Sequence, residues 1–250
     1  MEIISWNVNG LRSAERKGFS RWFASASPDI LCLQEIKTFP EQLPESLRNP
    51  QGYTSYFNPA GKAGYAGTAL YSRAKPLSVK TKLGFKQFDE EGRGIMAEYP
   101  SFTLLALYMP HGGRDKSKLS YKLEAYDFIF SLLRKLRDVP VLLIGDLNIA
   151  HHEIDLARPT QNTNNIMFTP EERGLLDRME KMGFTDTFRY FHKEGGCYTW
   201  WPYAFNARER NLGWRIDYAF TSQLLLPTLK RAPIFSTVSG SDHCPLGVGL

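Results

Sequence analysis

VPVLLIGDLN, residues 139–148, is the most apolar strand pattern in the chain, and it ends in a glycine, a carboxylate and an amide. A strand that is almost entirely apolar is typical of a sheet covered on both faces. Gly145 would allow a sharp turn, and Asp146 and Asn148, two positions apart, would point the same way if the chain stayed extended. An Asx-turn closing the strand is one interpretation; a water-orienting carboxylate beside a phosphate-binding amide is the other.

Further strand-like runs occupy residues 2–6, 29–34, 67–72, 95–99, 102–109, 215–220 and 245–250. Residues 116–137 carry apolar side chains at helical spacing, and residues 169–172 (TPEE) have the capping-box pattern that opens a helix, which we expect to end near residue 183. No linker, repeat or low-complexity tract divides the chain. We therefore expect one α/β domain over residues 1–250, with mixed sheets and helices packed outside them.

The bulk composition favours a soluble globular protein, with 250 residues, 42% hydrophobic and 23% charged. The net charge of +5 favours a polyanionic partner, either nucleic acid or an acidic membrane surface. No apolar run approaches the ~20 residues of a membrane span, and no signal-peptide pattern is present. Cys32, Cys197 and Cys244 form no CxxC pair, which favours a reducing compartment. We expect a cytoplasmic location, associated with the nucleoid in a prokaryote.

Polar residues also end the first two strand-like runs. Asn7 and Asn9 follow the first run and can face the same side, although Asn9-Gly10 is also an ordinary turn pair. Glu35 follows the second run, where it is either a solvated strand-end carboxylate or a ligand of Mg²⁺, a hard cation often held by one or two carboxylates.

A histidine with two candidate carboxylate partners lies near the carboxyl end of the chain. His243 follows Asp242 directly, and Asp217 ends the motif WRID, residues 214–217. A carboxylate that orients a histidine ring fixes one tautomer or stabilises imidazolium beside a phosphate. A serine hydrolase is disfavoured because adjacent triad residues would not converge and no G-x-S-x-G elbow is present.

Aromatic and basic residues alternate between residues 198 and 215. YTWW (residues 198–201) and Trp214 are interleaved with Arg208, Arg210 and Arg215, a mixture that suits contacts to bases, sugars and phosphates. The alternative is that some of these tryptophans belong to the core. Further candidates for contacts to a nucleic-acid backbone are Lys62, Tyr65, Arg93 and Arg114.

These motifs together resemble the exonuclease III class of apurinic/apyrimidinic endonucleases, within the endonuclease/exonuclease/phosphatase superfamily. The resemblance runs essentially end to end through WNVNGLR, LQEIK, EEGR, GDLNIAHHEIDLARP, FTPEER, YTWW, NLGWRIDY and GSDHCP. GDLN and SDH alone are typical of the whole superfamily, whereas GWRIDY, YTWW and AHHEIDL indicate the DNA-repair branch. The resemblance implies a four-layered α/β sandwich, in which two mixed β-sheets pack face to face with helices on the outside.

The resemblance also implies an activity. This class hydrolyses the phosphodiester 5′ to an abasic site in double-stranded DNA with Mg²⁺, for which Mn²⁺ can substitute. It commonly adds 3′–5′ exonuclease, 3′-phosphatase and 3′-phosphodiesterase activity on blocked 3′ ends, and action on uracil-containing DNA is a further expectation. No membrane partner is expected, and the resemblance favours a monomer.

The matching motifs imply roles in metal binding and water activation. Glu35 would be the principal metal ligand, with Asn9 and Asp242 nearby. Asp146 would align or deprotonate the attacking water, and Asn148 would orient Asp146 and contact the phosphate. Asn9 stands where some relatives have aspartate, which removes one anionic ligand.

The remaining catalytic roles concern the phosphate. His243, paired with Asp217, would bind the scissile phosphate and stabilise its developing charge. Asn7 and Tyr108 would complete the phosphate pocket. Fixed donors around a phosphodiester supply the charge stabilisation that in-line attack requires.

Contacts to DNA are implied for thirteen residues. Trp200, Trp214 and Ile216 would line a slot for a flipped-out abasic sugar. Phe205 lies in a segment that inserts into DNA in some relatives. His111 stands where many relatives have asparagine or glutamine, so we expect His111 to tune pH dependence or the balance of activities. The other implied contacts are Lys37, Lys62, Tyr65, Arg93, Arg114, Asn162, Asn165 and Arg208.

Two competing hypotheses remain. A lipid or inositol phosphatase of the same superfamily is disfavoured by the tryptophan-arginine segment. A DNA-binding scaffold without catalysis is disfavoured by the complete set of ionisable and amide residues.

Overall fold

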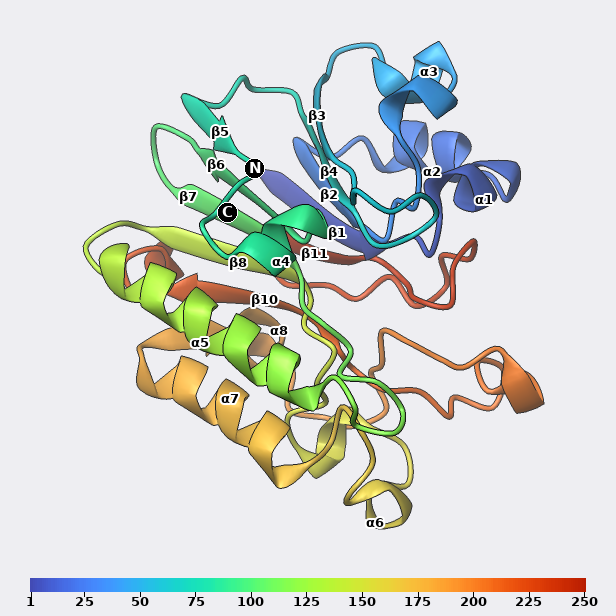
Figure 1. The fold of residues 1–250 in the computed structure, drawn as a ribbon, viewed down its shortest axis with the longest axis vertical. Helices are drawn as coiled ribbons and strands as arrows, with labels where there is room; N and C mark the ends of the chain where they lie inside the picture. Colours follow the sequence, from blue (N-terminus) through green and yellow to red (C-terminus); the bar gives the residue numbers. More distant parts are fainter.

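Two mixed β-sheets pack face to face in the computed structural model, which describes residues 1–250 (Figure 1). The first sheet has the order β11 (Leu246–Gly249), β1 (Glu2–Asn7), β2 (Ile30–Gln34), β4 (Thr68–Ser72) and β3 (Thr54–Asn58). The second has the order β5 (Ser78–Lys80), β6 (Gly94–Glu98), β7 (Thr103–Tyr108), β8 (Val141–Asp146), β10 (Asp217–Ser222) and β9 (Phe184–Asp186). Only the pairs β1–β2 and β7–β8 are parallel, so both sheets are mixed.

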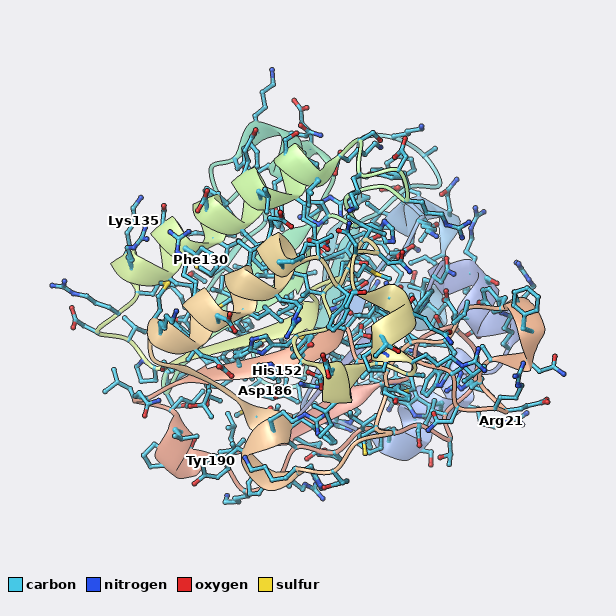
Figure 2. The ribbon with its side chains drawn as sticks, turned by 90° about the horizontal axis from the view of Figure 1, so that it is seen from below. Arg21, Phe130, Lys135, His152, Asp186 and Tyr190 are labelled. Atoms are coloured by element: carbon cyan, nitrogen blue, oxygen red, sulfur yellow. The ribbon has the colours of Figure 1, made fainter.

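Helices cover the outer face of each sheet. The first sheet is covered by α1 (Leu11–Arg16), α2 (Phe19–Ala26) and α3 (Glu45–Arg48). The second is covered by α5 (Leu119–Lys135) and α7 (Pro170–Lys181), which run side by side (Figure 2). Shorter elements in the connections are α4 (Lys86–Glu90), α6 (Pro159–Asn162), α8 (Thr187–Phe191), η1 (Pro40–Gln42), η2 (Glu153–Asp155), η3 (Ala204–Asn206) and η4 (Leu226–Thr228). The predicted four-layered α/β sandwich is confirmed.

The core forms three layers, as the apolar strands require. Ile3 and Ile30 of the first sheet meet Leu104 and Ile144 of the second in a buried cluster between the sheets. The outer faces of the sheets bury separate clusters against the helices. No helix is both long and apolar enough to cross a bilayer.

Gly145 does not make the turn that the sequence suggested, because it lies inside β8. Its φ is 145°, and a Cβ there would lie 1.9 Å from the carbonyl oxygen of Leu107 on the neighbouring strand β7. Glycine is therefore required by the close approach of two parallel strands, and the chain leaves the extended conformation only at Asn148, whose φ is 55°.

The strand predicted over residues 215–220 begins two residues later. Arg215 and Ile216 lie before β10 because their backbone groups bond elsewhere: Arg215 N donates to Asp155 O, and Ile216 O accepts from Leu147 N. The capping box of α7 is present, with Thr169 Oγ1 accepting from Glu172 N at 3.2 Å. The short strands β3, β5 and β9 were not predicted.

Candidate active site

Strand ends from both sheets bring the predicted catalytic residues together. Asn7 ends β1 and Glu35 follows β2 in the first sheet, whereas Tyr108 ends β7 and Asp146 ends β8 in the second. Asn7 Nδ2 donates to Glu35 Oε1 and to Asp146 Oδ2, both at 2.9 Å. Tyr108 OH donates to Glu35 Oε1 at 2.9 Å. The two sheets thus share one polar network at their common edge.

Asp146 is oriented by the residue two positions after it. Asn148 N donates to Asp146 Oδ1 at 2.9 Å, and Asn148 Nδ2 donates to Met109 O at 2.9 Å and lies 3.3 Å from Asp146 Oδ2. The bond from Asn148 N to Asp146 Oδ1 closes an Asx-turn, and the positive φ of Asn148, 55°, then changes the direction of the chain after it. The Asx-turn is therefore present, and the same hydrogen bonds also orient the Asp146 carboxylate, so the two interpretations of this pair are compatible.

His243 is paired with Asp217, as the sequence suggested. Asp217 Oδ2 lies 2.8 Å from His243 Nδ1, and both side chains are buried. Asp217 is also directly opposite Asp146 in the antiparallel pair β8–β10. Two carboxylates and one imidazole are thereby held together with little access to water.

This crowding shifts the pKa values of Asp146 and His243. Burial and the charge of Asp217 raise the pKa of Asp146 to about 8, partly offset by His243. Burial lowers the pKa of His243, but the ion pair with Asp217 and the charge of Asp146 outweigh it and raise the pKa to about 10. The histidine is therefore an imidazolium at neutral pH, and Asp146 is an unusually basic carboxylate.

Glu35 behaves differently from Asp146. Burial raises its pKa, but the Lys37 ammonium, whose Nζ lies 2.7 Å from Glu35 Oε2, and the hydrogen bond from Asn7 bring the pKa below its usual range. Glu35 is thus ionised at neutral pH.

The donor atoms around Glu35 fit a hard divalent cation. Ligand atoms of Glu35, Asp146 and His243 lie within 4.8 Å of one another. Asn9 and Asp242 are joined by a hydrogen bond from Asn9 Nδ2 to Asp242 Oδ1 at 2.9 Å, and this pair is linked to Glu35 through Lys37, which donates to Asn9 Oδ1. Carboxylate and amide oxygens dominate the set, which suits Mg²⁺ or Mn²⁺ and not a soft metal.

A cavity of about 350 Å³ lies beside this network. Its lining includes His111, Arg114, Asn165, Trp200 and Trp214. Trp200 Nε1 donates to Asp242 Oδ2 at 3.1 Å, which joins the cavity to the predicted metal ligands. Five predicted DNA contacts therefore surround one hollow next to the catalytic residues.

Ile216 lies beneath this cavity instead of lining it. Its side chain is 1% exposed and belongs to a buried apolar cluster against which Trp200 and Trp214 pack. Thr199 supports the same region, because its Oγ1 accepts from the backbone nitrogens of Ile216 and Asp217, both at 3.1 Å. Sequence patterns gave no signal for Thr199 beyond its place in YTWW.

The other predicted DNA contacts have varied surroundings. Lys62 and Tyr65 line a separate cavity of about 360 Å³, and Asn162 accepts a hydrogen bond from Asn165 Nδ2 at 2.7 Å. Phe205 projects from η3 with 85% of its side chain exposed and a positive φ of 61°. Such an exposed ring is available to a partner.

Two arginines predicted to contact a nucleic acid are buried, and those predictions need correction. Arg93 is 3% exposed, forms an ion pair with Glu91 and donates to Tyr108 O at 3.2 Å. Arg215 is 1% exposed, with Nε 2.8 Å from Asp155 Oδ1. Neither guanidinium can reach a DNA phosphate without disrupting a buried ion pair, so both support the fold around the site.

Arg208 also faces the protein. Its Nη1 donates to Ser241 O at 3.0 Å, its Nη2 donates to Ser236 O and Val238 O, and its guanidinium stacks over the ring of Trp201 at 4.7 Å. These bonds hold the loop that leads into Asp242 and His243.

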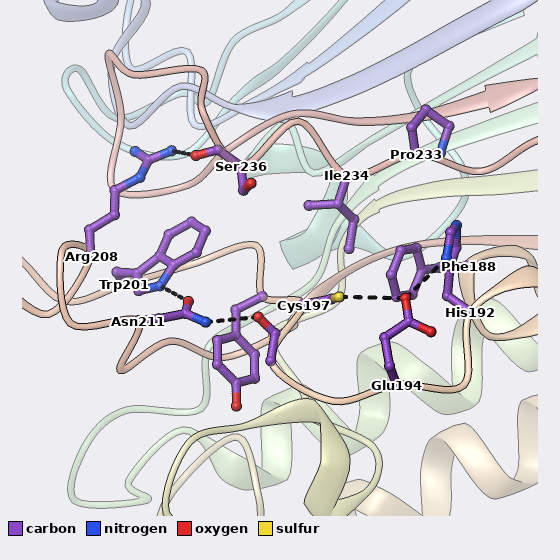
Figure 3. A pocket seen from close by; sticks show the side chains of 12 residues that line it. Phe188, His192, Glu194, Cys197, Trp201, Arg208, Asn211, Pro233, Ile234 and Ser236 are labelled. Atoms are coloured by element: carbon purple, nitrogen blue, oxygen red, sulfur yellow. Dashed lines mark hydrogen bonds and ion pairs between the residues drawn. The ribbon is translucent and has the colours of Figure 1, made fainter.

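A cavity of about 490 Å³ lies on the other side of residues 197–201 and contains none of the catalytic residues (Figure 3). Phe188, Cys197 and Ile234 are among its walls, and Cys197 Sγ lies 3.9 Å from Glu194 Oε1. Burial and the charge of Glu194 raise the pKa of the Cys197 thiol, so it stays protonated at neutral pH. The chemistry is therefore concentrated at the strand ends and not in this cavity.

The fold is a four-layered sandwich, and carboxylates and a paired histidine lie where its two sheets meet. This combination places the protein in the class of α/β phosphoesterases and nucleases. Residues 4–243 match the endonuclease/exonuclease/phosphatase family, and the chain belongs to it. An exodeoxyribonuclease of Bacillus subtilis is 41% identical over 249 residues, covering 98% of each chain. The predicted family and the prediction of an enzyme are confirmed.

Solved structures agree over nearly the whole chain. An AP endonuclease from Archaeoglobus fulgidus matches with a TM-score of 0.90 and 29% identity, covering 99% of this chain and 98% of that one. A 3′ phosphatase from Neisseria, solved with a product DNA hairpin, matches with a TM-score of 0.89 and 28% identity, again covering 99% and 98%. These relatives support a DNA-repair nuclease.

Proposed function

We propose that this chain is a Mg²⁺-dependent phosphodiesterase that cleaves the DNA backbone 5′ to abasic sites and leaves a 3′-hydroxyl. The observation that carries the proposal is the network in which Asn7 joins Glu35 to Asp146, next to the buried Asp217–His243 pair. Together these groups supply a basic carboxylate, an anionic metal ligand and a fixed cation, next to the cavity that Trp200 and Trp214 line.

The proposed reaction is in-line hydrolysis of one P–O3′ bond. Water adds its oxygen to phosphorus, and the O3′ atom leaves and acquires a proton. Asp146 aligns the water and, in its ionised form, accepts a proton from it; the raised pKa makes that ionised form a stronger base than an ordinary aspartate. Asn148 holds the Asp146 carboxylate in place. We expect its amide to contact the phosphate when DNA is bound.

Charge on the phosphoryl oxygens is stabilised by fixed groups. The His243 imidazolium, held by Asp217, donates to one oxygen, and Asn7 and Tyr108 complete the phosphate pocket. Glu35 would hold Mg²⁺, with Asn9 and Asp242 contributing nearby, and Mn²⁺ would substitute. When bound, the metal supplies Lewis-acid stabilisation of the phosphoryl and leaving oxygens.

The substrate is proposed to be double-stranded DNA with an abasic site or a blocked 3′ end. Trp200 and Trp214 offer apolar walls for a flipped-out sugar, and Arg114 and His111 line the same cavity. The names of solved relatives from Neisseria support additional 3′–5′ exonuclease and 3′-phosphatase activity. Action on uracil-containing DNA, a monomeric state, one catalytic domain over residues 1–250 and a cytoplasmic, nucleoid-associated location stay predictions.

The test is cleavage of an end-labelled duplex that contains one abasic site, with Mg²⁺, Mn²⁺ or EDTA. We expect cleavage 5′ to the site with either metal, none with EDTA, and losses of at least about 100-fold in Glu35→Ala and Asp146→Ala. Glu45→Ala, which removes an exposed carboxylate, is the matched control. Full activity in both site variants would refute the proposal, and release of a lipid headgroup or inositol phosphate without DNA cleavage would favour a phosphatase.

A second labelled set separates the subsidiary activities. Duplexes with a 3′-phosphate, an undamaged 3′ end and a deoxyuridine report the 3′-phosphatase, exonuclease and uracil-directed activities in turn. Binding to all of these duplexes without cleavage of any would favour a non-catalytic scaffold.

A further inference from the structure

A lysine on the buried side of α5 contacts the two loops that carry the catalytic groups of the second sheet. Lys122 Nζ donates to Asn148 O at 2.6 Å, lies 3.4 Å from His111 O, and donates to Glu172 Oε1. The side chain of Lys122 has no exposed surface. Its three N–H groups therefore match three acceptors, and none of these acceptors is water.

Glu172 carries the negative charge that pairs with Lys122, and both of its carboxylate oxygens accept hydrogen bonds. Its Oε2 accepts from Thr169 N at 3.1 Å and from Thr169 Oγ1 at 3.0 Å, while its Oε1 faces Lys122. The capping box of α7 is thus connected to the active-site loops through the Glu172–Lys122 pair. A buried pair of this kind contributes little net stability by itself, because desolvation offsets the attraction between the charges.

The next turn of α5 reinforces the contact. Tyr126, four residues after Lys122 and so on the same helix face, donates from its OH to Leu147 O at 2.6 Å. Two consecutive carbonyls, those of Leu147 and Asn148, are therefore held by one helix. They belong to the segment in which Asn148 has a positive φ and donates to Asp146.

We propose that Lys122 is a positioning residue for hydrolysis: with Glu172 as its counter-charge, it fixes the backbone at Asn148 and His111 so that Asn148 holds the Asp146 carboxylate. This inference rests on the proposed function. Lys122 is buried and cannot touch DNA, so we expect its main effect on the chemical step through Asn148 and a smaller effect on KM through His111. A displacement of about 1 Å at a catalytic group can cost about 100-fold in rate.

The experiment compares kcat and KM of purified full-length variants on the abasic-site duplex at saturating Mg²⁺, together with thermal midpoints. Lys122→Met should lower kcat by roughly 100-fold and change KM by less than about threefold. Arg178→Met is the matched control, because Arg178 on α7 forms an exposed ion pair with Asp127 on α5, at 2.6 Å, without contacting either loop. Its kcat should stay within about twofold of wild type.

The double variant Lys122→Met/Glu172→Gln separates positioning from folding. The double variant no longer has the Glu172 carboxylate that Lys122→Met leaves buried without a partner, so its thermal midpoint should recover relative to Lys122→Met. Its kcat should stay low because Asn148 O still lacks its donor. Recovery of kcat together with the midpoint would overturn the proposal, as would a kcat for Lys122→Met equal to that of Arg178→Met.

Tyr126→Phe keeps all charges and covers the case in which Lys122→Met does not fold. It should lower kcat severalfold with little change in KM, and an unchanged kcat in both Tyr126→Phe and the double variant would also overturn the proposal. If wild type does not cleave the duplex, the proposed function fails instead. The two failures are therefore distinguishable.

Discussion

Asp217 and His243 form a buried ion pair in which Asp217 Oδ2 lies 2.8 Å from His243 Nδ1, although 26 residues separate them. The pairing fixes the ring, so that Nε2 is the nitrogen left for a phosphate oxygen. It also raises the pKa of His243 to about 10, against the effect of burial. The histidine therefore acts as a permanent cation at neutral pH, and not as a group poised to exchange its proton.

Asp217→Asn should lower kcat by roughly 100-fold at pH 7 and bring the alkaline loss of activity to lower pH. The sign follows from the charge: losing the carboxylate lowers the pKa of His243, so the imidazolium is lost earlier as pH rises. The measurement is kcat between pH 6 and pH 10 at saturating metal, in wild type and variant. An alkaline limb at the same pH in both proteins would contradict the role given to Asp217.

Glu35→Gln should weaken metal binding more than DNA binding. Replacing the anionic Glu35 with a neutral amide keeps an acceptor for Asn7 and Tyr108 but removes the charge that attracts a divalent cation. We expect the Mg²⁺ concentration for half-maximal activity to rise at least about tenfold, with DNA affinity in EDTA nearly unchanged. A metal titration at fixed DNA measures this effect, and Glu45→Gln, an exposed carboxylate, is the control.

Arg208→Met distinguishes the predicted DNA contact from the structural role seen here. If Arg208 mainly holds the carbonyls of Ser236, Val238 and Ser241, the variant should lose thermal stability and kcat because the loop before His243 loosens. The dependence of DNA affinity on salt should not change. A phosphate contact would instead reduce the slope of log K against log salt by about 1. Binding measured at several salt concentrations decides between the two.

His111→Asn should alter activity only on the acidic side. Burial and the nearby charge of Lys122 lower the pKa of His111, so it is neutral at pH 7 and gains its proton only below the ordinary histidine value of about 6.5. Wild type should therefore keep relatively more DNA affinity than the variant as pH falls towards 5, because the imidazolium adds positive charge beside Arg114 in the cavity. If wild type and His111→Asn have identical pH–rate and pH–affinity profiles, His111 does not contribute positive charge to DNA binding at acidic pH.

The strand ends could be predicted from sequence because each one breaks a long apolar run with a carboxylate or an amide. That pattern located Glu35, Asp146 and Asn7, whose convergence the two-sheet packing then produces. The helix α7 was predictable from its capping box, since that signal is local.

Burial of charged residues could not be predicted from the same patterns. From sequence, Arg93 and Arg215 are expected to be surface cations. In the fold, Arg93 pairs with Glu91 only two residues away but is buried by its long-range contact with Tyr108 O, and Arg215 pairs with Asp155 from a distant segment. Lys122 falls on the apolar stripe of α5, four residues before Tyr126, but its three acceptors come from segments far along the chain. The missing information was long-range pairing, which decides whether a charge is solvated or structural.

Asp155 should make the protein sensitive to acid between pH 4 and pH 2. Burial raises its pKa, but the Arg215 and Arg189 guanidinium groups outweigh burial and bring the pKa to about 2. Because the folded pKa is depressed, the stabilisation is complete above the unfolded value of about 3.9 and is lost as pH falls through the folded value. The difference of about 1.9 pKa units corresponds to roughly 2–3 kcal/mol.

Urea unfolding at pH 5, 4, 3 and 2.5 measures this contribution. Wild type should lose unfolding free energy more steeply than Asp155→Asn below pH 4. Asp155→Asn should already be less stable at pH 5 by roughly 3 kcal/mol, because it removes the carboxylate that both Arg189 and the buried Arg215 face. Asp138→Asn removes an exposed carboxylate and should follow the wild-type curve. If the unfolding free energies of wild type and Asp155→Asn fall in parallel with pH, another group neutralises Arg215. The candidate is Asp186, whose Oδ2 lies 2.7 Å from Arg215 Nη1.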